Sequence, residues 1–218
     1  MSGAGCVLFD LDGTLYDSQD YSRRLDEEVA RYVSEQMSTD FEDARALLEE
    51  RRKKLGTLTR SLESLGIDRG RFFEVMSTRV EPANYLGPDP AIQSTISRLK
   101  EYGFKVALVS NSGRPLVEKV LNALHVDIAV FDGTVTSSEA PPKPNPDSFL
   151  FALKLLNCRV GSAVYVGDRD EAELRPAKEL GIRTVLLDRT GKSSSRWADV
   201  VVGSLTEVPD IIRGLLSG

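Results

Sequence analysis

The sequence predicts an α/β protein: a doubly wound parallel sheet with a helical domain inserted near its start. Short apolar runs rich in β-branched residues alternate with segments whose apolar residues recur at helical spacing, and this alternation is typical of such a sheet. One long stretch shows helical spacing only. The chain has 218 residues, which suits one large domain that carries an insertion.

Six apolar runs are the predicted strands. The first, residues 6–9, is a continuous apolar run followed directly by Asp10, as in a strand buried on both faces. The others have the same β-branched character, and the last is expected at an edge of the sheet. They span residues 105–110, 128–131, 162–166, 183–187 and 199–202.

Helical patterns lie between these runs. Ile92, Ile96 and Leu99 recur at i, i+4 and i+7, and further helices are expected over 116–124 and 149–156. The long stretch after the first strand keeps helical spacing throughout, without a strand pattern. We therefore expect a sheet domain made of residues 1–15 and 86–218, and a helical cap domain made of residues 16–85.

Composition and charge exclude several classes of protein. Hydrophobic residues make up 41% of the chain and charged residues 28%, as in ordinary soluble globular proteins. The net charge of −5 provides no general attraction to nucleic acid or anionic lipid. The sequence has no signal-peptide pattern and no apolar run of about 18 residues. We expect a cytoplasmic protein with no nucleic-acid or membrane partner.

The rarity of cysteine and histidine limits the chemistry that is available. Cys6 and Cys158 lie far apart beside apolar residues, and we interpret both as buried small hydrophobes rather than as a disulfide or a zinc site. The single histidine, His125, cannot serve both a Ser/His/Asp triad and a His-rich metal site. Catalysis is therefore expected to use carboxylates, hydroxyls, lysine and arginine.

Polar groups occur at four points along the predicted sheet domain, each at the expected end of a strand. Ligands bind beyond the carboxyl ends of the strands in open parallel sheets. Each group alone has a simpler explanation: an Asp-Gly turn, a helix cap, an exposed lysine, or acids favoured by a helix N-terminus. In chain order the groups are Asp10, Asp12 and Thr14, then Ser110 and Asn111, then Lys143, and finally Asp168 with Glu173.

Taken together, these groups resemble the motifs of the haloacid dehalogenase-like hydrolase superfamily. The resemblance rests on Asp-x-Asp-Gly-Thr, Ser-Asn, Lys-Pro and Gly-Asp in that order, and it covers nearly the whole chain, including the helical cap. It implies a Rossmann-like core and phosphatase activity. One departure occurs in the fourth motif, where Ala172 replaces the second aspartate of many members and Glu173 matches a longer spacing.

The chemistry of phosphate esters fits these residues. A phosphate monoester is a dianion, so an attacking carboxylate needs its charge neutralised locally. Asp10 and Asp168 supply hard oxygen ligands of the kind that Mg²⁺ prefers. The resemblance adds the main-chain carbonyl of Asp12 and the carboxylate of Glu173 as further metal ligands. We therefore expect Mg²⁺ as the cofactor.

Each remaining group has an expected role in hydrolysis. Asp10 is the expected nucleophile, which forms an aspartyl phosphate, and Asp12 is the general acid and base. Lys143 offsets the negative charge around Asp10. The residues expected to bind the phosphoryl oxygens are Thr14, Ser110 and Asn111.

The helical domain is expected to recognise the leaving group. Its pattern of Gly56, Thr57, Arg60 and Leu62 resembles the branch that includes pyrimidine 5′-nucleotidases or phosphoglycolate phosphatases, and makes Arg60 a candidate substrate-binding residue. The expected partner is a small-molecule phosphomonoester, with a nucleoside monophosphate as one candidate. The alternatives are a phosphomutase, a 2-haloacid dehalogenase and a non-catalytic binding protein on the same scaffold.

Overall fold

The structure, a computed structural model, describes residues 5–216. It divides into two compact units. The first comprises the described residues up to Asp17, then Pro88–Asn111, and the described residues from His125 onward. The second comprises Ser18–Gly87 together with Ser112–Leu124. This second unit therefore contains a short segment from the part of the sequence that we assigned to the sheet domain.

Six parallel strands form the sheet of the first unit, in the order β3-β2-β1-β4-β5-β6. The first strand in the chain lies inside the sheet, where Cys6 is in register with Lys105 on one side and with Ala163 on the other. The predicted doubly wound parallel sheet is confirmed. The strands are β1 (Cys6–Phe9), β2 (Lys105–Val109), β3 (Gly133–Val135), β4 (Ala163–Gly167), β5 (Arg183–Leu187) and β6 (Val200–Val202).

One strand prediction is wrong. The apolar run at 128–131 is not a strand, because Ile128–Val130 forms a 3₁₀ turn, η2. The Asp127 carboxylate stabilises this turn by accepting a hydrogen bond from the Ala129 amide at 2.9 Å. The strand β3 begins only at Gly133. A run of four apolar residues is too short for its periodicity to separate a strand from a turn.

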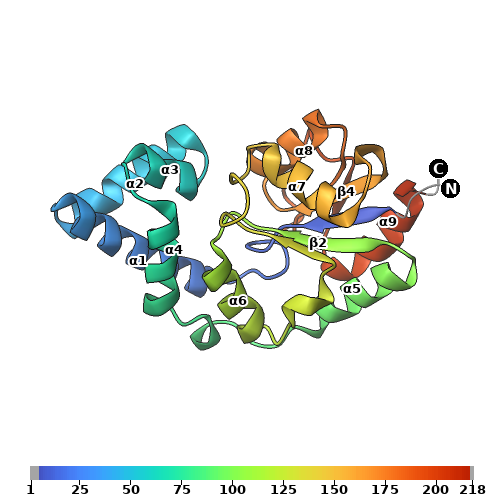
Figure 1. Cartoon of the computed structure of the whole chain (residues 1–218), viewed down its shortest axis with the longest axis horizontal. Helices are drawn as coiled ribbons and strands as arrows, with labels where there is room; N and C mark the ends of the chain where they lie inside the picture. The colour runs from blue at the N-terminus through green and yellow to red at the C-terminus, as the bar shows by residue number, and fades with distance from the viewer. Residues whose placement is uncertain (1–4, 217–218) are drawn as a thin grey trace. The chain divides into compact units, whose positions relative to one another are not determined.

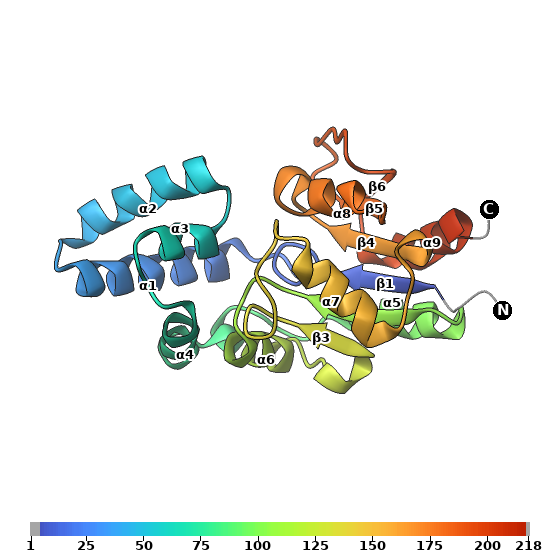
Figure 2. The same ribbon diagram turned by 45° about the horizontal axis from the view of Figure 1, so that its top comes forward.

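Helices cover both faces of this sheet. Figures 1 and 2 show α7 and α8 on one face and α5 and α9 on the other. The expected helices at 92–99 and 149–156 are confirmed as α5 and α7. The elements are α5 (Pro90–Glu101), α7 (Asp147–Leu156), η3 (Val160–Ser162), η4 (Asp170–Leu174), α8 (Arg175–Glu179), η5 (Leu205–Glu207) and α9 (Val208–Leu216).

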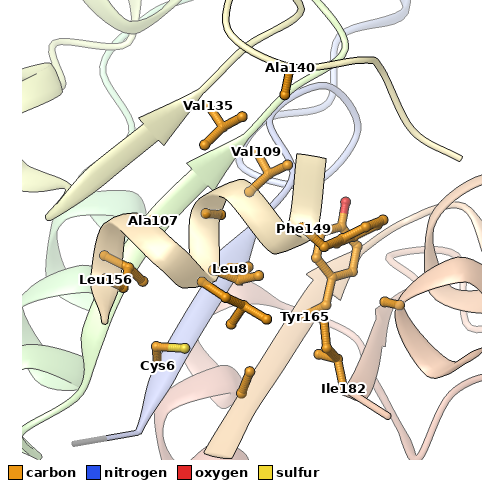
Figure 3. Packing of buried hydrophobic residues seen from close by; sticks show 14 of the residues in the cluster. Cys6, Leu8, Ala107, Val109, Val135, Ala140, Phe149, Leu156, Tyr165 and Ile182 are labelled. Carbon is orange, nitrogen blue, oxygen red and sulfur yellow. The ribbon is translucent and has the colours of Figure 1, made fainter. Parts of the chain in front are cut away.

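The core between the sheet and α7 forms because alternate strand residues face the helix. Cys6 and Leu8 of β1 lie in this cluster with Tyr165 of β4, as Figure 3 shows. The Phe149 ring of α7 meets the Tyr165 ring edge-on, with centroids 5.0 Å apart. The packing therefore anchors Tyr165, whose hydroxyl belongs to the site described below.

The two cysteines correct the sequence interpretation. Cys6 and Cys158 form a disulfide between the start of β1 and the segment that follows α7, and their Cα atoms are 6.3 Å apart. Cys158 is only partly buried. The pairing spans 152 residues, so the sequence pattern alone contains no signal that these two positions meet in space.

The described helical unit contains helices and no strand, as the spacing predicts. Helices α1 to α4 each begin at a side-chain cap, for example Ser18 before α1 and Asp40 before α2. Its core joins apolar residues such as Val33, Ala44 and Phe72 with Leu116 of α6. The elements are α1 (Gln19–Met37), α2 (Phe41–Leu55), α3 (Leu58–Ser64), α4 (Arg69–Arg79), η1 (Pro82–Asn84) and α6 (Arg114–Ala123).

Within residues 5–216, none of the helices has the length and apolar character needed to cross a lipid bilayer.

Candidate active site

The carboxyl ends of the central strands bring the predicted polar groups to one edge of the sheet. Asp10 directly follows β1, Ser110 follows β2 and Asp168 follows β4, and these strands are neighbours in the sheet. The Asp10 amide still donates to the Val166 carbonyl at 2.9 Å. The ladder therefore fixes the backbone of Asp10 beside the end of β4.

Three carboxylates form a compact acidic cluster at this edge. One oxygen from each of Asp10, Asp168 and Glu173 lies within 4.8 Å of the others. Asp10 and Glu173 are buried, and Asp168 is partly buried. Burial, followed by the negative charge of Asp10, raises the pKa of Glu173 to about 8 and the pKa of Asp168 to about 6. The cluster therefore favours either protons or a bound cation.

A wide helical turn explains how Glu173 reaches the cluster. Residues Asp170–Leu174 form a π-helical turn, in which the Arg175 amide donates to the Asp170 carbonyl. Such turns contain one more residue than an α-helical turn and often occur at functional sites. The five-residue spacing from Asp168 to Glu173, a departure in the sequence motif, therefore has a structural basis.

Two glycines allow the backbone to approach these carboxylates. Gly13 has a φ of +87°, and a Cβ atom there would lie 2.3 Å from Oδ2 of Asp168. A Cβ atom on Gly167 would lie 2.6 Å from Oε2 of Glu173. Contacts this short mean that a side chain at either position would displace these carboxylates. Gly13 therefore both forms the turn and lets the backbone lie directly against the Asp168 carboxylate.

Lys143 lies at the centre of the buried site, with its side chain fully excluded from solvent. Its ammonium group donates to the Asp10 carboxylate, to the Tyr165 hydroxyl at 2.7 Å and to Oε1 of Glu173 at 3.1 Å. Burial alone would lower the pKa of Lys143, but the charges of Asp10 and Glu173 outweigh burial and raise it. These contacts rule out the alternative of an exposed lysine.

Tyr165 is a site residue that sequence reasoning missed. Its hydroxyl contacts Lys143, and burial together with the charges of Glu173 and Asp10 raises its pKa well above the ordinary value. Tyr165 therefore stays neutral and satisfies one of the three lysine donors. A tyrosine inside a buried strand needs a partner for its hydroxyl, and this need was the available signal.

Asn111 fixes the loop that carries Lys143. Its Nδ2 donates to the Lys143 carbonyl at 2.8 Å, and its Oδ1 accepts from the Lys143 amide at 2.7 Å. Ser110 is buried beside it at the end of β2. The structure thus brings both residues to the site and gives Asn111 a positioning role. Direct binding of phosphoryl oxygens by either residue stays a prediction.

The turn after β1 places Asp12 and Thr14 beside the acidic cluster. The Tyr16 hydroxyl donates to the Asp12 carboxylate, and the Gly13 amide donates to the Tyr16 carbonyl at 2.9 Å. Thr14 is fully buried, and its hydroxyl donates to Oδ1 of Asp168 at 3.4 Å. This contact ties the first motif to the fourth. Substrate binding by Thr14 stays a prediction.

Arg60 belongs to the helical unit, where its sequence pattern has a local structural explanation. Gly56 ends α2 with a φ of +82°, and the Thr57 hydroxyl caps α3 by accepting from the Arg60 amide at 3.3 Å. The Arg60 guanidinium donates to the Leu55 carbonyl at 3.5 Å. The pattern therefore describes a junction between two helices, and substrate binding by Arg60 stays a prediction.

The acidic cluster fits a hard divalent cation. Oε2 of Glu173 is buried and has no hydrogen-bond partner among the described residues, although a buried carboxylate oxygen normally has one. It lies in the same cluster as the carboxylates of Asp10 and Asp168. Carboxylate oxygens in this number and arrangement are typical ligands of Mg²⁺ and similar ions.

The structure thus brings to one edge of the sheet a carboxylate at a strand end, a buried lysine and an acidic cluster, which come from the motifs singled out in the sequence. The chain belongs to the haloacid dehalogenase-like hydrolase family, whose match covers residues 5–181.

Several known proteins that are similar to this chain are phosphatases. A phosphoglycolate phosphatase of Aquifex aeolicus is 34% identical, over 94% of this chain and 89% of that protein. A glyceraldehyde 3-phosphate phosphatase of Methanocaldococcus jannaschii is 28% identical, over 96% of this chain and 97% of that protein. The solved structure of a haloacid dehalogenase-like phosphatase from Thermococcus onnurineus shares the fold, with a TM-score of 0.72 and 24% sequence identity. The match covers 96% of this chain and 98% of that chain. The chain is a phosphoric monoester hydrolase.

Proposed function

We propose that this chain hydrolyses a small phosphomonoester with the help of Mg²⁺, through an aspartyl phosphate on Asp10. The observation that supports this most strongly is the buried contact of Lys143 with both Asp10 and Glu173, beside a carboxylate oxygen that lacks a partner. The carboxylates of Asp10 and Glu173 would by themselves repel a phosphate dianion. The Lys143 ammonium between them supplies positive charge that offsets this repulsion.

In the first half of the reaction, Asp10 attacks phosphorus. Because Lys143 contacts Oδ1 of Asp10, we assign the attack to Oδ2. A bond forms between Oδ2 and phosphorus, and the ester bond between phosphorus and the leaving oxygen breaks. Asp12 donates its proton to that oxygen, so the leaving group departs as a neutral alcohol.

In the second half, water removes the phosphoryl group from Asp10. Asp12, now a carboxylate, accepts a proton from the water as its oxygen attacks phosphorus. The bond from phosphorus to Asp10 breaks, inorganic phosphate leaves, and both carboxylates return to their starting states. Lys143 stays protonated throughout and holds Asp10 in place.

Asp10, Asp168 and Glu173 would hold the metal ion, and the family resemblance adds the main-chain carbonyl of Asp12. When bound, Mg²⁺ would supply positive charge that neutralises the phosphoryl group. The raised pKa values of Asp168 and Glu173 mean that the metal-free cluster competes for protons. Metal binding should therefore weaken as the pH falls.

The names of the relatives favour a compact substrate. Phosphoglycolate and glyceraldehyde 3-phosphate, named for two relatives, carry two and three carbon atoms. We therefore place phosphorylated two- and three-carbon compounds first and nucleoside monophosphates second. Arg60 remains our candidate for contact with the leaving group, which an Arg60→Ala variant compared across the two substrate classes would test.

A phosphate-release screen tests the proposal. Wild-type protein is assayed with Mg²⁺ on phosphoglycolate, glyceraldehyde 3-phosphate, sugar phosphates and nucleoside monophosphates, and then with excess chelator. Asp10→Asn should abolish turnover, whereas Asp210→Asn, a change at an exposed acid paired with Arg98, should not. Full activity in chelator, or near wild-type rates from Asp10→Asn, would contradict the mechanism.

The same screen separates the alternatives. Halide release from a 2-haloacid without metal would indicate a dehalogenase. Dependence on a sugar bisphosphate would indicate a phosphomutase. The absence of phosphate release from every ester, including an activated chromogenic ester, would indicate a binding protein.

A further inference from the structure

A long side chain links the end of β5 to the turn that carries Asp12. Arg189 follows β5 by two residues, and its Nη1 donates to the Gly13 carbonyl at 2.6 Å. Its Nη2 donates to the Thr14 carbonyl, also at 2.6 Å. Because β4 lies between β5 and β1 in the sheet, this fork spans the end of β4 to reach the turn.

The two carbonyls belong to the part of the turn that touches the site. Gly13 packs so closely on Asp168 that a Cβ atom would overlap its carboxylate, and the Thr14 hydroxyl donates to the same carboxylate. Asp12 lies directly before them. A shift of this turn would therefore move Asp12 relative to Asp10, and a misplacement of about 1 Å can cost about 100-fold in rate.

The loop that carries Arg189 is itself fixed by hydrogen bonds. The Asp188 carboxylate accepts from the Thr190 amide at 2.9 Å, from the Thr190 hydroxyl at 2.6 Å and from the Ser193 amide at 2.7 Å. The Asp188 amide donates to the Val202 carbonyl of β6 at 2.9 Å. This carboxylate thus organises the loop after β5, and the adjacent guanidinium is directed to the turn.

The planar guanidinium suits two successive carbonyls. Its nitrogens form a rigid fork that donates two hydrogen bonds in fixed directions, whereas a lysine ammonium is a single point of charge on a flexible stem. A lysine at this position would reach one carbonyl or the other, without fixing their relative orientation.

We propose that Arg189 is a positioning residue of the phosphatase, which sets the place of Asp12 by holding the carbonyls of Gly13 and Thr14. It touches neither the reacting atoms nor the carboxylates and acts only through the turn. This inference rests on the proposed function for its effect on catalysis, whereas its effect on the turn is independent of any substrate.

The test compares two arginines at opposite ends of β5. Arg189→Ala should lower kcat by about 10- to 100-fold with KM within about threefold, since orientation rather than binding is lost. The control is Arg183→Ala, because Arg183 at the start of β5 also donates to a loop carbonyl, that of Gly161 at 3.1 Å. It should leave kcat unchanged. Added guanidinium at non-denaturing concentration should partly restore Arg189→Ala, and Arg189→Lys should recover little.

A second measurement needs no substrate. Hydrogen exchange of the backbone amides of residues 11–16 should accelerate in Arg189→Ala and stay unchanged in Arg183→Ala. If the wild type hydrolyses no ester, the proposed function is wrong. Hydrogen exchange then still tests whether Arg189 holds the turn in place. Equal losses of kcat in the two variants, a change in KM alone, or unchanged exchange in the turn would overturn the inference.

Discussion

The Tyr16 hydroxyl donates a hydrogen bond to the Asp12 carboxylate, so the expected general acid and base is held by a residue four positions later in the same turn. Tyr16 is buried, and its backbone carbonyl accepts from the Gly13 amide. The side chain and the main chain of one residue therefore fix both Asp12 and the glycine beside it.

Tyr16→Phe should lower kcat by about 10- to 100-fold, because a hydrogen bond to a charged group contributes about 1.5–3 kcal/mol. Steady-state kinetics on the best substrate of the screen provide the measurement. Tyr102→Phe is a matched control, since Tyr102 donates to Asp210 at 2.9 Å in an exposed pair away from the site. Similar kinetics for both variants would show that the Tyr16 contact is only structural.

Asp12→Ala should lose activity mainly in kcat, by about 10²–10⁴-fold, because general acid–base help is removed while binding is kept. An ester with an activated leaving group should partly recover the first step. The phosphorylated enzyme should then accumulate, because the water that attacks it also relies on Asp12. A rise in KM alone, with kcat unchanged for both kinds of ester, would make Asp12 a binding residue.

Divalent metal should stabilise the protein more at about pH 8 than at about pH 5.5. The pKa of Glu173 is about 8 in the fold against an ordinary 4.5, so the metal-free folded state binds the proton more tightly than the unfolded chain. That contribution to the free energy of unfolding is present below pH 4.5 and is lost as the pH rises through 8. Mg²⁺ binds the deprotonated carboxylates, and Tm measured with and without Mg²⁺ reports the gain.

Glu173→Gln should reduce both the rise in Tm that Mg²⁺ causes and the dependence of that rise on pH, because the amide neither titrates nor provides a charged ligand. Glu171→Gln serves as the control, since Glu171 is an exposed acid on the same turn and pairs with Arg196. A Mg²⁺-dependent rise in Tm of full size in Glu173→Gln would place the ion elsewhere.

Reduction of the Cys6–Cys158 disulfide should lower the free energy of unfolding by about 2–4 kcal/mol, because the bond restricts the unfolded chain. Denaturant unfolding with and without a thiol reductant measures this loss. Cys158→Ser should show the lower stability in both conditions and should not respond to reductant. Equal stability of the oxidised and reduced wild type would show that the bond contributes nothing.

The sequence was enough to predict the sheet and the acids at its edge. Asp10 and Asp168 directly follow buried strands, and parallel topology brings such positions together without further information. The run at 128–131 misled because its length suits a strand and a turn equally. The decisive signal there was Asp127, a residue outside the apolar run.

Contacts between distant segments lay outside what the pattern predicts. Tyr165 reads as one more apolar strand residue, although its hydroxyl contacts a lysine 22 residues away. Arg189 reaches Gly13 across 176 residues, and the cysteines pair across 152. Such pairs depend on how strands and loops meet in three dimensions, and neither periodicity nor motif spacing encodes that meeting in a single sequence.

The place of β1 inside the sheet has a consequence for synthesis on the ribosome. Among the strands of the sheet, β1, which precedes Asp10, is made first, yet its two neighbours begin only at Lys105 and Ala163, and Lys143 lies 133 residues after Asp10. The helices of residues 18–87 have local contacts that form early, whereas pairing between distant strands is slow. A nascent chain that ends before Ala163 therefore leaves one edge of β1 unpaired, and the acidic cluster is completed only once Glu173 has been added.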